Sequence, residues 1–134
     1  MFLSMRIASR LVVAVMVVAG ASSVAVSGNA LSAASLLHLR LIKSEPSKGD
    51  TVAAPTAIKL WFSEPATLAV TSIKLKGPDG KDIPLGRVSF TGDLSQPVAT
   101  TVSGSLVAGR YQVTYKTASR DMHPVTGDYS FVVR

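Results

Sequence analysis

The chain has 134 residues, a formal net charge of +6 and no cysteine. The absence of cysteine excludes disulfides, thiolate metal sites and thiol redox chemistry. The basic residues are scattered along the chain and few aromatic residues lie among them. This distribution favours a solvated basic surface over a nucleic-acid-binding surface.

The beginning of the chain predicts a cleaved signal peptide over residues 1–30. Two arginines precede an apolar run at residues 11–26, which is shorter than the roughly 20 residues of a membrane-spanning helix. Ala30 ends a stretch of small residues that is typical of a signal peptidase site, and cleavage positions up to Ser35 also fit. We therefore expect one exported, periplasmic domain over residues 38–134.

Beyond the signal, the sequence predicts short β-strands. Runs of β-branched or alternating residues are separated by Gly, Pro and Asp turns, and no long stretch has a helical period. The predicted strands cover residues 39–44, 57–62, 69–76, 87–90, 98–102, 109–117 and 129–133. About seven short strands favour an all-β fold, an immunoglobulin-like antiparallel β-sandwich with Greek-key connections, and a small closed barrel is the main alternative. Trp61, in the middle of a predicted strand, is expected in the core.

His123 is the stronger of two candidate metal-binding histidines. It lies between two predicted strands, and Asp121 precedes it by two residues. In an extended segment, side chains two residues apart point to the same side, so Asp121 and His123 can converge on one ion. Pro124 favours an extended conformation at His123. Imidazole and carboxylate suit a divalent ion such as copper or zinc. The alternative is that Asp121 only orients His123 or caps a turn.

Other candidate residues carry weaker signals. His38 is the only other histidine, and it is either a third ligand or a solvated strand terminus. Glu64 follows a predicted strand and is either a surface acid or an acceptor that supports a ligating histidine. Met122 is the only methionine beyond the signal, and one thioether cannot form a Cu(I) cluster. Any copper held by nitrogen and oxygen here is therefore expected to be Cu(II).

Catalytic motifs are missing from the sequence. It contains no Gly-x-Ser-x-Gly, no phosphate-binding loop and no zincin motif. Most remaining acidic residues stand beside Gly or Pro, as turn residues do. The sequence thus predicts a binding protein and not an enzyme.

Three segments resemble the CopC family of copper-binding proteins. Residues 38–49 resemble the start of the mature family proteins, where a histidine opens a strand that runs into a Ser-x-Pro-x-x-Gly turn. Residues 61–65, Trp-Phe-Ser-Glu-Pro, resemble a second family signature. Residues 121–131 resemble a third, the Asp-x-His-Pro-Val-x-Gly run before the final strand. In this order, the segments span essentially the whole chain beyond the signal.

The resemblance implies a periplasmic Cu(II)-binding β-sandwich that takes part in copper tolerance or uptake. It implies His38, Asp121 and His123 as copper ligands and Glu64 as a supporting acid near them. It also implies that copper is exchanged with a CopD-like inner-membrane protein, and we expect a monomer. Two alternatives remain: a metal-free interaction module for a membrane partner, and a histidine-brace copper oxygenase, for which the chain is short.

One departure from the family pattern concerns the mature N-terminus. In the tightest-binding family members the histidine is the first residue, so its amine also binds copper. Here Leu37 precedes His38, and leucine is a poor residue for signal peptidase to cut after. Without further trimming, the amine is lost as a ligand and weaker binding is expected. Cleavage after Ser35 would place His38 third, where the new amine, the amides and the imidazole can hold Cu(II) in a plane.

Overall fold

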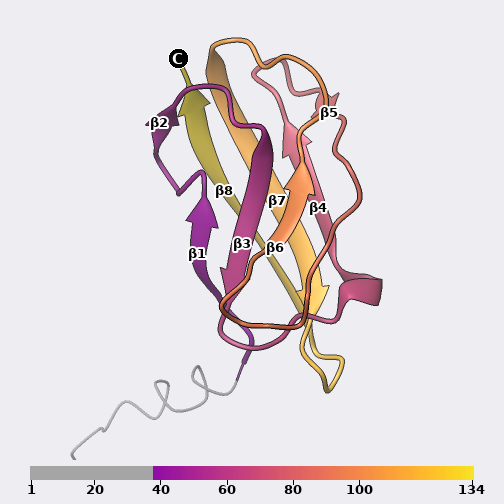
Figure 1. Ribbon diagram of the computed structural model, residues 1–134. Coiled ribbons are helices and arrows are strands. Elements are labelled where there is room, and N and C mark those ends of the chain that lie inside the picture. Colours follow the sequence, from indigo (N-terminus) through magenta and orange to yellow (C-terminus); the bar gives the residue numbers. More distant parts are fainter. Residues whose placement is uncertain (1–37) are drawn as a thin grey trace, which may run out of the picture.

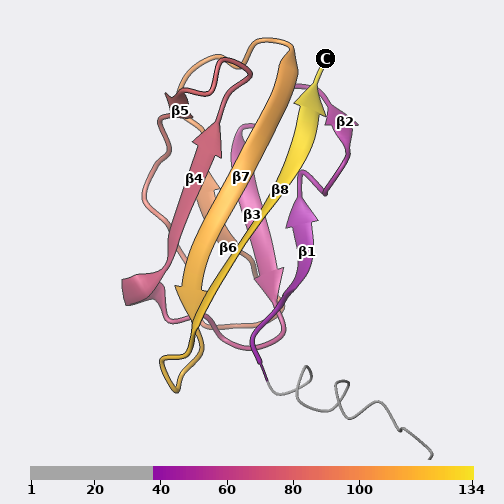
Figure 2. The ribbon, with the colours of Figure 1, turned by 180° about the vertical axis from the view of Figure 1, so that it is seen from behind.

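The structure, a computed structural model, describes residues 38–134. Two β-sheets lie face to face in this part of the chain (Figures 1 and 2). The predicted signal peptide, residues 1–30, and its cleavage positions lie outside the described residues. Among residues 38–134, no helix has the length and apolar character needed to cross a membrane.

The two sheets differ in size. The smaller sheet has the order β1-β3-β6, with β1 (Leu41–Glu45), β3 (Ala57–Phe62) and β6 (Val98–Thr101). The larger sheet has the order β2-β8-β7-β4-β5, with β2 (Thr51–Val52), β8 (Pro124–Val133), β7 (Gly109–Ala118), β4 (Ser72–Lys76) and β5 (Asp82–Ile83). A short 3-10 turn, η1 (Leu68–Val70), precedes β4. Neighbouring strands are antiparallel except β2, which runs parallel to β8.

These layers confirm the predicted immunoglobulin-like β-sandwich, although several strand predictions differ in detail. The predicted strand over 87–90 is wrong, because Ser89 makes only an isolated bridge with Ala99. β8 begins at Pro124 and not at residue 129. A proline is tolerated as the first residue of a strand, where its missing N–H leaves no ladder bond broken. β2 and β5 are too short to produce a periodic signal in the sequence.

The core lies between the inner faces of the two sheets. Buried and half-buried residues alternate along β3, and Leu60 and Phe62 are buried on the inward side. The larger sheet contributes Tyr111 and Phe131, whose rings stack with centres 5.7 Å apart, and Tyr115, whose ring meets Phe62 edge-on at 5.6 Å. The contact between Phe62 and Tyr115 joins the end of β3 to β7 across the core.

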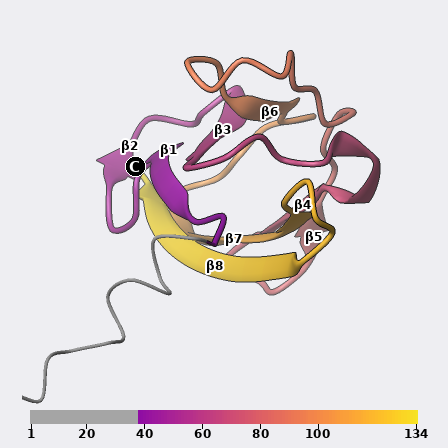
Figure 3. The same ribbon diagram turned by 90° about the horizontal axis from the view of Figure 1, so that it is seen from below.

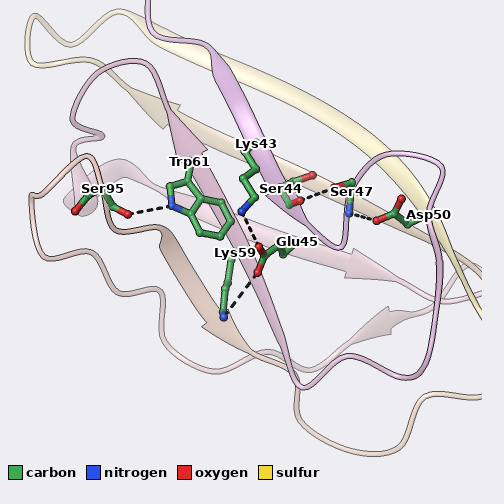
Figure 4. A network of polar contacts seen from close by, with 8 residues as sticks. All are labelled: Lys43, Ser44, Glu45, Ser47, Asp50, Lys59, Trp61 and Ser95. Carbon is green, nitrogen blue, oxygen red and sulfur yellow. Dashed lines mark hydrogen bonds and ion pairs between the residues drawn. The ribbon is translucent and has the colours of Figure 1, made fainter.

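Trp61 lies on the outer face of the smaller sheet, so the prediction of a core tryptophan is wrong. The period of two along β3 turns Trp61 away from the core residues on either side of it. Its indole Nε1 donates to the carbonyl of Ser95 at 3.3 Å, and the Lys43 Nζ lies 4.4 Å from the ring centre (Figure 4). Glu45 joins Lys43 at 2.8 Å and Lys59 at 3.8 Å on the same face.

One end of the sandwich gathers segments that are distant in the sequence, and we call it the hairpin end. It comprises residues 38–40, η1, the loop of residues 91–97 and the β7–β8 hairpin loop of residues 119–123, and Figure 3 views the molecule from this side. The backbone N–H of Thr67 donates to the carbonyl of Ala118 at 2.9 Å, which ties the segment before η1 to the end of β7.

Candidate metal centre

The β7–β8 hairpin loop carries two of the predicted site residues. Ala118 pairs with Pro124, and two backbone hydrogen bonds close the loop: Ser119 N–H to His123 O at 3.3 Å and Met122 N–H to Ser119 O at 2.9 Å. Met122 has a φ of 64°, in the left-handed region that few residues other than glycine adopt. The segment is therefore a tight turn and not the extended run that the spacing predicted.

The turn nevertheless brings Asp121 and His123 together. Oδ2 of Asp121 lies 2.5 Å from Nδ1 of His123, and Oδ1 accepts a hydrogen bond from the hydroxyl of buried Ser119. The Ser119 hydroxyl first, and His123 second, lower the pKa of Asp121 to about 2. The carboxylate is thus ionised at neutral pH and held in one place, and Nε2 of His123 remains without a hydrogen-bond partner in the described part of the chain.

His38, at the other end of the domain sequence, lies close to His123. Its ring centre lies 6.4 Å from that of His123, with an angle of 64° between the rings. The Ser63 hydroxyl donates to the His38 carbonyl at 3.5 Å and accepts from the Arg40 N–H at 3.0 Å. Ser63 N–H in turn donates to Arg40 O at 2.9 Å. These bonds hold the residues around His38 against the end of β3.

The two imidazoles are close, but they do not yet form a closed metal site. No group of three His, Asp or Glu side chains within residues 38–134 is arranged to hold an ion as it stands. Because an imidazole nitrogen binds a metal at roughly 2 Å, two rings on opposite sides of one ion have centres roughly 6 Å apart. The separation of 6.4 Å is near this value. His38 is exposed, so solvent and ions have access to its imidazole.

Glu64 lies two residues beyond the end of β3. It follows Ser63, which contacts the backbone of His38, and it is half-buried. Within residues 38–134, Glu64 makes no hydrogen bond or ion pair. Its predicted role as a supporting acid stays a prediction. Ser119 was not predicted as a site residue. Its position two residues before Asp121 was the available signal, because serine often bonds to nearby polar groups in turns.

Comparison with known proteins places the chain in a family. Residues 41–134 match the family model described as the CopC domain. The chain belongs to the CopC family. It is 35% identical over 114 residues to copper resistance protein C of Pseudomonas syringae pv. tomato, a match that covers 81% of this chain and 90% of that CopC-family relative. The resemblance seen in the three sequence segments is therefore confirmed.

Solved structures of CopC-family proteins share the sandwich. The crystal structure of CopC from Methylosinus trichosporium OB3b has a TM-score of 0.59 at 32% identity, covering 72% of this chain and 93% of that chain. The crystal structure of PcoC, a methionine-rich copper resistance protein from Escherichia coli, has a TM-score of 0.60 at 32% identity, covering 72% of this chain and 99% of that chain. The fold that carries His38 and His123 is thus a CopC fold.

Proposed function

We propose that this chain is a periplasmic Cu(II)-binding protein that carries or buffers copper in copper homeostasis or resistance. The observation that supports this function most directly is the approach of His38 and His123 at the hairpin end, with ring centres 6.4 Å apart, beside the carboxylate of Asp121. Membership of the CopC family, with a relative named for copper resistance, supports copper as the ion. The protein acts as a monomer and has no catalytic role.

The proposed ligands are His38, Asp121 and His123. While the contact between Asp121 and His123 is kept, Nε2 of His123 is the nitrogen open to copper. For Asp121 to bind the same ion as His123, its Oδ2 has to leave Nδ1, because the two ring nitrogens face opposite directions. Each carboxylate oxygen has two lone pairs, so Asp121 can bind the ion while Ser119 still donates to it. Glu64 is kept as a supporting acid that approaches when the ion is bound.

The donor set favours Cu(II) over Cu(I). Imidazole and carboxylate suit the harder, oxidised ion, whereas thioethers select Cu(I). Met122 is the only methionine in residues 38–134, in contrast to the E. coli relative described as methionine-rich. A Cu(I) site built from several thioethers has no counterpart in this part of the chain.

The exposure of the site supports a carrier role. The side chains of His123 and Asp121 are 67% and 64% exposed, so an acceptor protein can reach the ion without unfolding the sandwich. We propose a CopD-like inner-membrane protein as that partner. The N-terminus sets how tightly copper is held before transfer. If processing ends at Ser35, the new amine adds to the ligands, and the mass of the processed protein decides this.

Copper titration of the processed protein tests the proposal. His38→Ala and His123→Ala are each expected to weaken Cu(II) binding by about 100-fold or more, beyond the usual effect of losing a supporting residue. Asp82→Ala is the matched control, because Asp82 is an exposed acid paired with Lys76 on β4 and not with a histidine. Equal binding by the wild type and both histidine variants would show that the site is wrongly assigned.

A further inference from the structure

The inward-facing positions of β7 change in character toward the hairpin end. Tyr111, Val113 and Tyr115 face the core. The same alternation then brings two hydroxyl side chains to buried positions, with Thr117 1% exposed and Ser119 6% exposed. A buried hydroxyl loses its hydration and is tolerated only when it has a hydrogen-bond partner. Apolar side chains would fill these positions at a lower cost, so the hydrogen bonds of the two hydroxyls indicate their role.

The Ser119 hydroxyl bonds to the candidate metal centre and not to the core. It donates to Oδ1 of Asp121, whose Oδ2 lies beside Nδ1 of His123. The side chain of Asp121 is 64% exposed, so the surrounding packing does little to restrict its rotation. Ser119 is buried at the end of a strand, where close packing leaves a side chain few positions. Its hydroxyl therefore gives an exposed carboxylate a fixed anchor.

Ser119 is held in turn by the residues on either side of η1. The backbone N–H of Thr67 donates to Ala118 O at 2.9 Å, and the Thr67 hydroxyl donates to Ser119 O at 3.1 Å. The Thr71 hydroxyl donates to Thr67 O at 2.8 Å. Its proton is thereby used, so the Thr117 hydroxyl is the donor in their contact at 2.7 Å. Hydrogen bonds thus run from the inward side of β7, past η1, to the β7–β8 hairpin loop.

The hydroxyls of Thr67 and Ser119 are not needed to satisfy buried polar groups in the loop. The carbonyl of Ser119 also accepts the Met122 N–H at 2.9 Å, so it stays paired when the Thr67 hydroxyl is removed. The carboxylate of Asp121 is exposed, so water replaces the Ser119 hydroxyl when that group is removed. Loss of either hydroxyl is therefore expected to change where the loop side chains lie more than it changes the stability of the domain.

We propose that Ser119, supported by Thr67, is a positioning residue for the copper site. This inference rests on the proposed function, which supplies the ion. In the copper-free protein, Ser119 holds Asp121 against His123, and the carboxylate accepts the Nδ1 proton, so the ring presents the lone pair of Nε2. A ligand that is already in place loses less freedom when it binds. The positioning acts before binding, whether Asp121 then stays at Nδ1 or moves to the ion.

The ring tautomer of His123 in the copper-free protein tests the positioning directly. Nitrogen-15 chemical shifts of the ring, recorded at mildly alkaline pH, distinguish a proton on Nδ1 from a proton on Nε2. The wild type is expected to carry the proton on Nδ1. Ser119→Ala and Thr67→Val are each expected to move part of the population to the Nε2 tautomer. Thr67→Ser keeps the hydroxyl and is expected to restore the wild-type shifts.

Copper affinity of the processed protein is the second readout. Ser119→Ala is expected to weaken Cu(II) binding by about 10-fold and Thr67→Val by about threefold, because each acts on the ligands through another residue. Thr100→Val is the matched control. It also removes a buried hydroxyl that donates to a carbonyl, that of Gly86 at 2.8 Å. Thr100 pairs with Ile58 near the start of β3, away from the hairpin end, so this variant is expected to bind copper as the wild type does.

Two outcomes would overturn the proposal. In the first, Ser119→Ala keeps both the Nδ1 tautomer and the wild-type affinity. In the second, Thr100→Val weakens copper binding as much as Ser119→Ala does, which would make the effect one of general stability. If Ser119→Ala fails to fold, the comparison of Thr67→Val with Thr67→Ser decides in its place. A wild type that binds no copper while the tautomers differ as expected would refute the proposed function and leave the positioning of His123 standing.

Discussion

Oδ2 of Asp121 lies 2.5 Å from Nδ1 of His123, which leaves Nε2 of His123 as the nitrogen available to an ion. Two roles for the carboxylate are distinguished by what happens to this contact: it persists when copper binds at Nε2, or Oδ2 leaves Nδ1 and binds the ion. Asp121 either binds copper itself or only orients the imidazole, as carboxylates often do for ligating histidines. The amide of asparagine keeps an oxygen that can accept a hydrogen bond but loses the charge, so it separates the two roles.

Asp121→Asn is expected to weaken Cu(II) binding about as much as Asp121→Ala does, by about 10-fold to 100-fold. The reason is that a direct ligand needs the negative charge, which both substitutions remove. Competition with a chelator of known affinity measures the change. If Asp121→Asn binds as the wild type does while Asp121→Ala is impaired, Asp121 orients His123 and is not a ligand.

Met122→Gly is expected to stabilise the domain. A left-handed φ costs a residue other than glycine about 1–2 kcal/mol, and the greater freedom of glycine in the unfolded chain cancels part of the gain. The free energy of unfolding should therefore rise by about 0.5–1 kcal/mol in urea titrations. Met122→Ala is the control, because alanine shortens the side chain while keeping the strain at φ 64°. A decrease for the glycine variant would show that the thioether packs more favourably than its 56% exposure indicates.

The sequence predicted the two layers of the fold better than it predicted local geometry. Apolar and polar residues alternate strongly along β7, and turn residues flank the strand. The predicted strand over 109–117 therefore ends only one residue before β7 does. The approach of His38 to His123 followed from family resemblance, since no local pattern records which strand ends meet. The turn at residues 119–123 was missed because a methionine stands at the left-handed position where glycine usually signals a hairpin.

Trp61 illustrates why composition alone misplaces a residue. A lone tryptophan in a strand is usually core, but a shift of one position along a strand exchanges the two faces. Burial on β3 falls on Ile58, Leu60 and Phe62, which leaves Trp61 with Lys43 on the outside. Only the alternation of its neighbours could have corrected the prediction.

Because Trp61 lies on the outer face, its substitution by alanine is expected to destabilise the domain less than the same substitution of the smaller but buried Leu60. Leu60 is fully buried, so Leu60→Ala is expected to lower the free energy of unfolding by about 2–5 kcal/mol. Trp61→Ala, on the outer face, is expected to cost only about 1–2 kcal/mol, since it loses the Lys43 contact and the bond to Ser95 but leaves no core cavity. Urea unfolding measures both. A larger loss for Trp61 than for Leu60 would contradict the assigned faces.

Loss of the hydroxyl group is expected to change the free energy of unfolding differently at two buried tyrosines. The Tyr111 hydroxyl donates to Val107 O at 2.8 Å, so Tyr111→Phe should lower the free energy of unfolding by about 1 kcal/mol. The Tyr129 hydroxyl is buried without a hydrogen-bond partner within the described part of the chain, although the Ser44 side chain lies close enough to affect its pKa. Tyr129→Phe removes an unsatisfied polar atom and is expected to be neutral or to stabilise by up to about 1 kcal/mol. Equal losses in the two variants would mean that the Tyr129 hydroxyl is satisfied after all.

The raised pKa of Tyr129 also predicts how stability changes at alkaline pH. Burial raises the pKa of Tyr129 to about 12, because the phenolate would lose its hydration, and the nearby Tyr115 raises it further. The folded-state pKa is above the value of about 10 in the unfolded chain, so the neutral side chain contributes stability in full below about pH 10. This contribution is lost as pH rises from about 10 to about 12.

The urea midpoint should therefore fall over this range, and the fall should be shallower in Tyr129→Phe. Burial and the charge of Asp128 also raise the pKa of Tyr115, so part of the slope remains in that variant. If the ultraviolet absorbance of tyrosinate shows all three tyrosines ionising near pH 10 in the folded protein, the burial of Tyr129 is wrongly described.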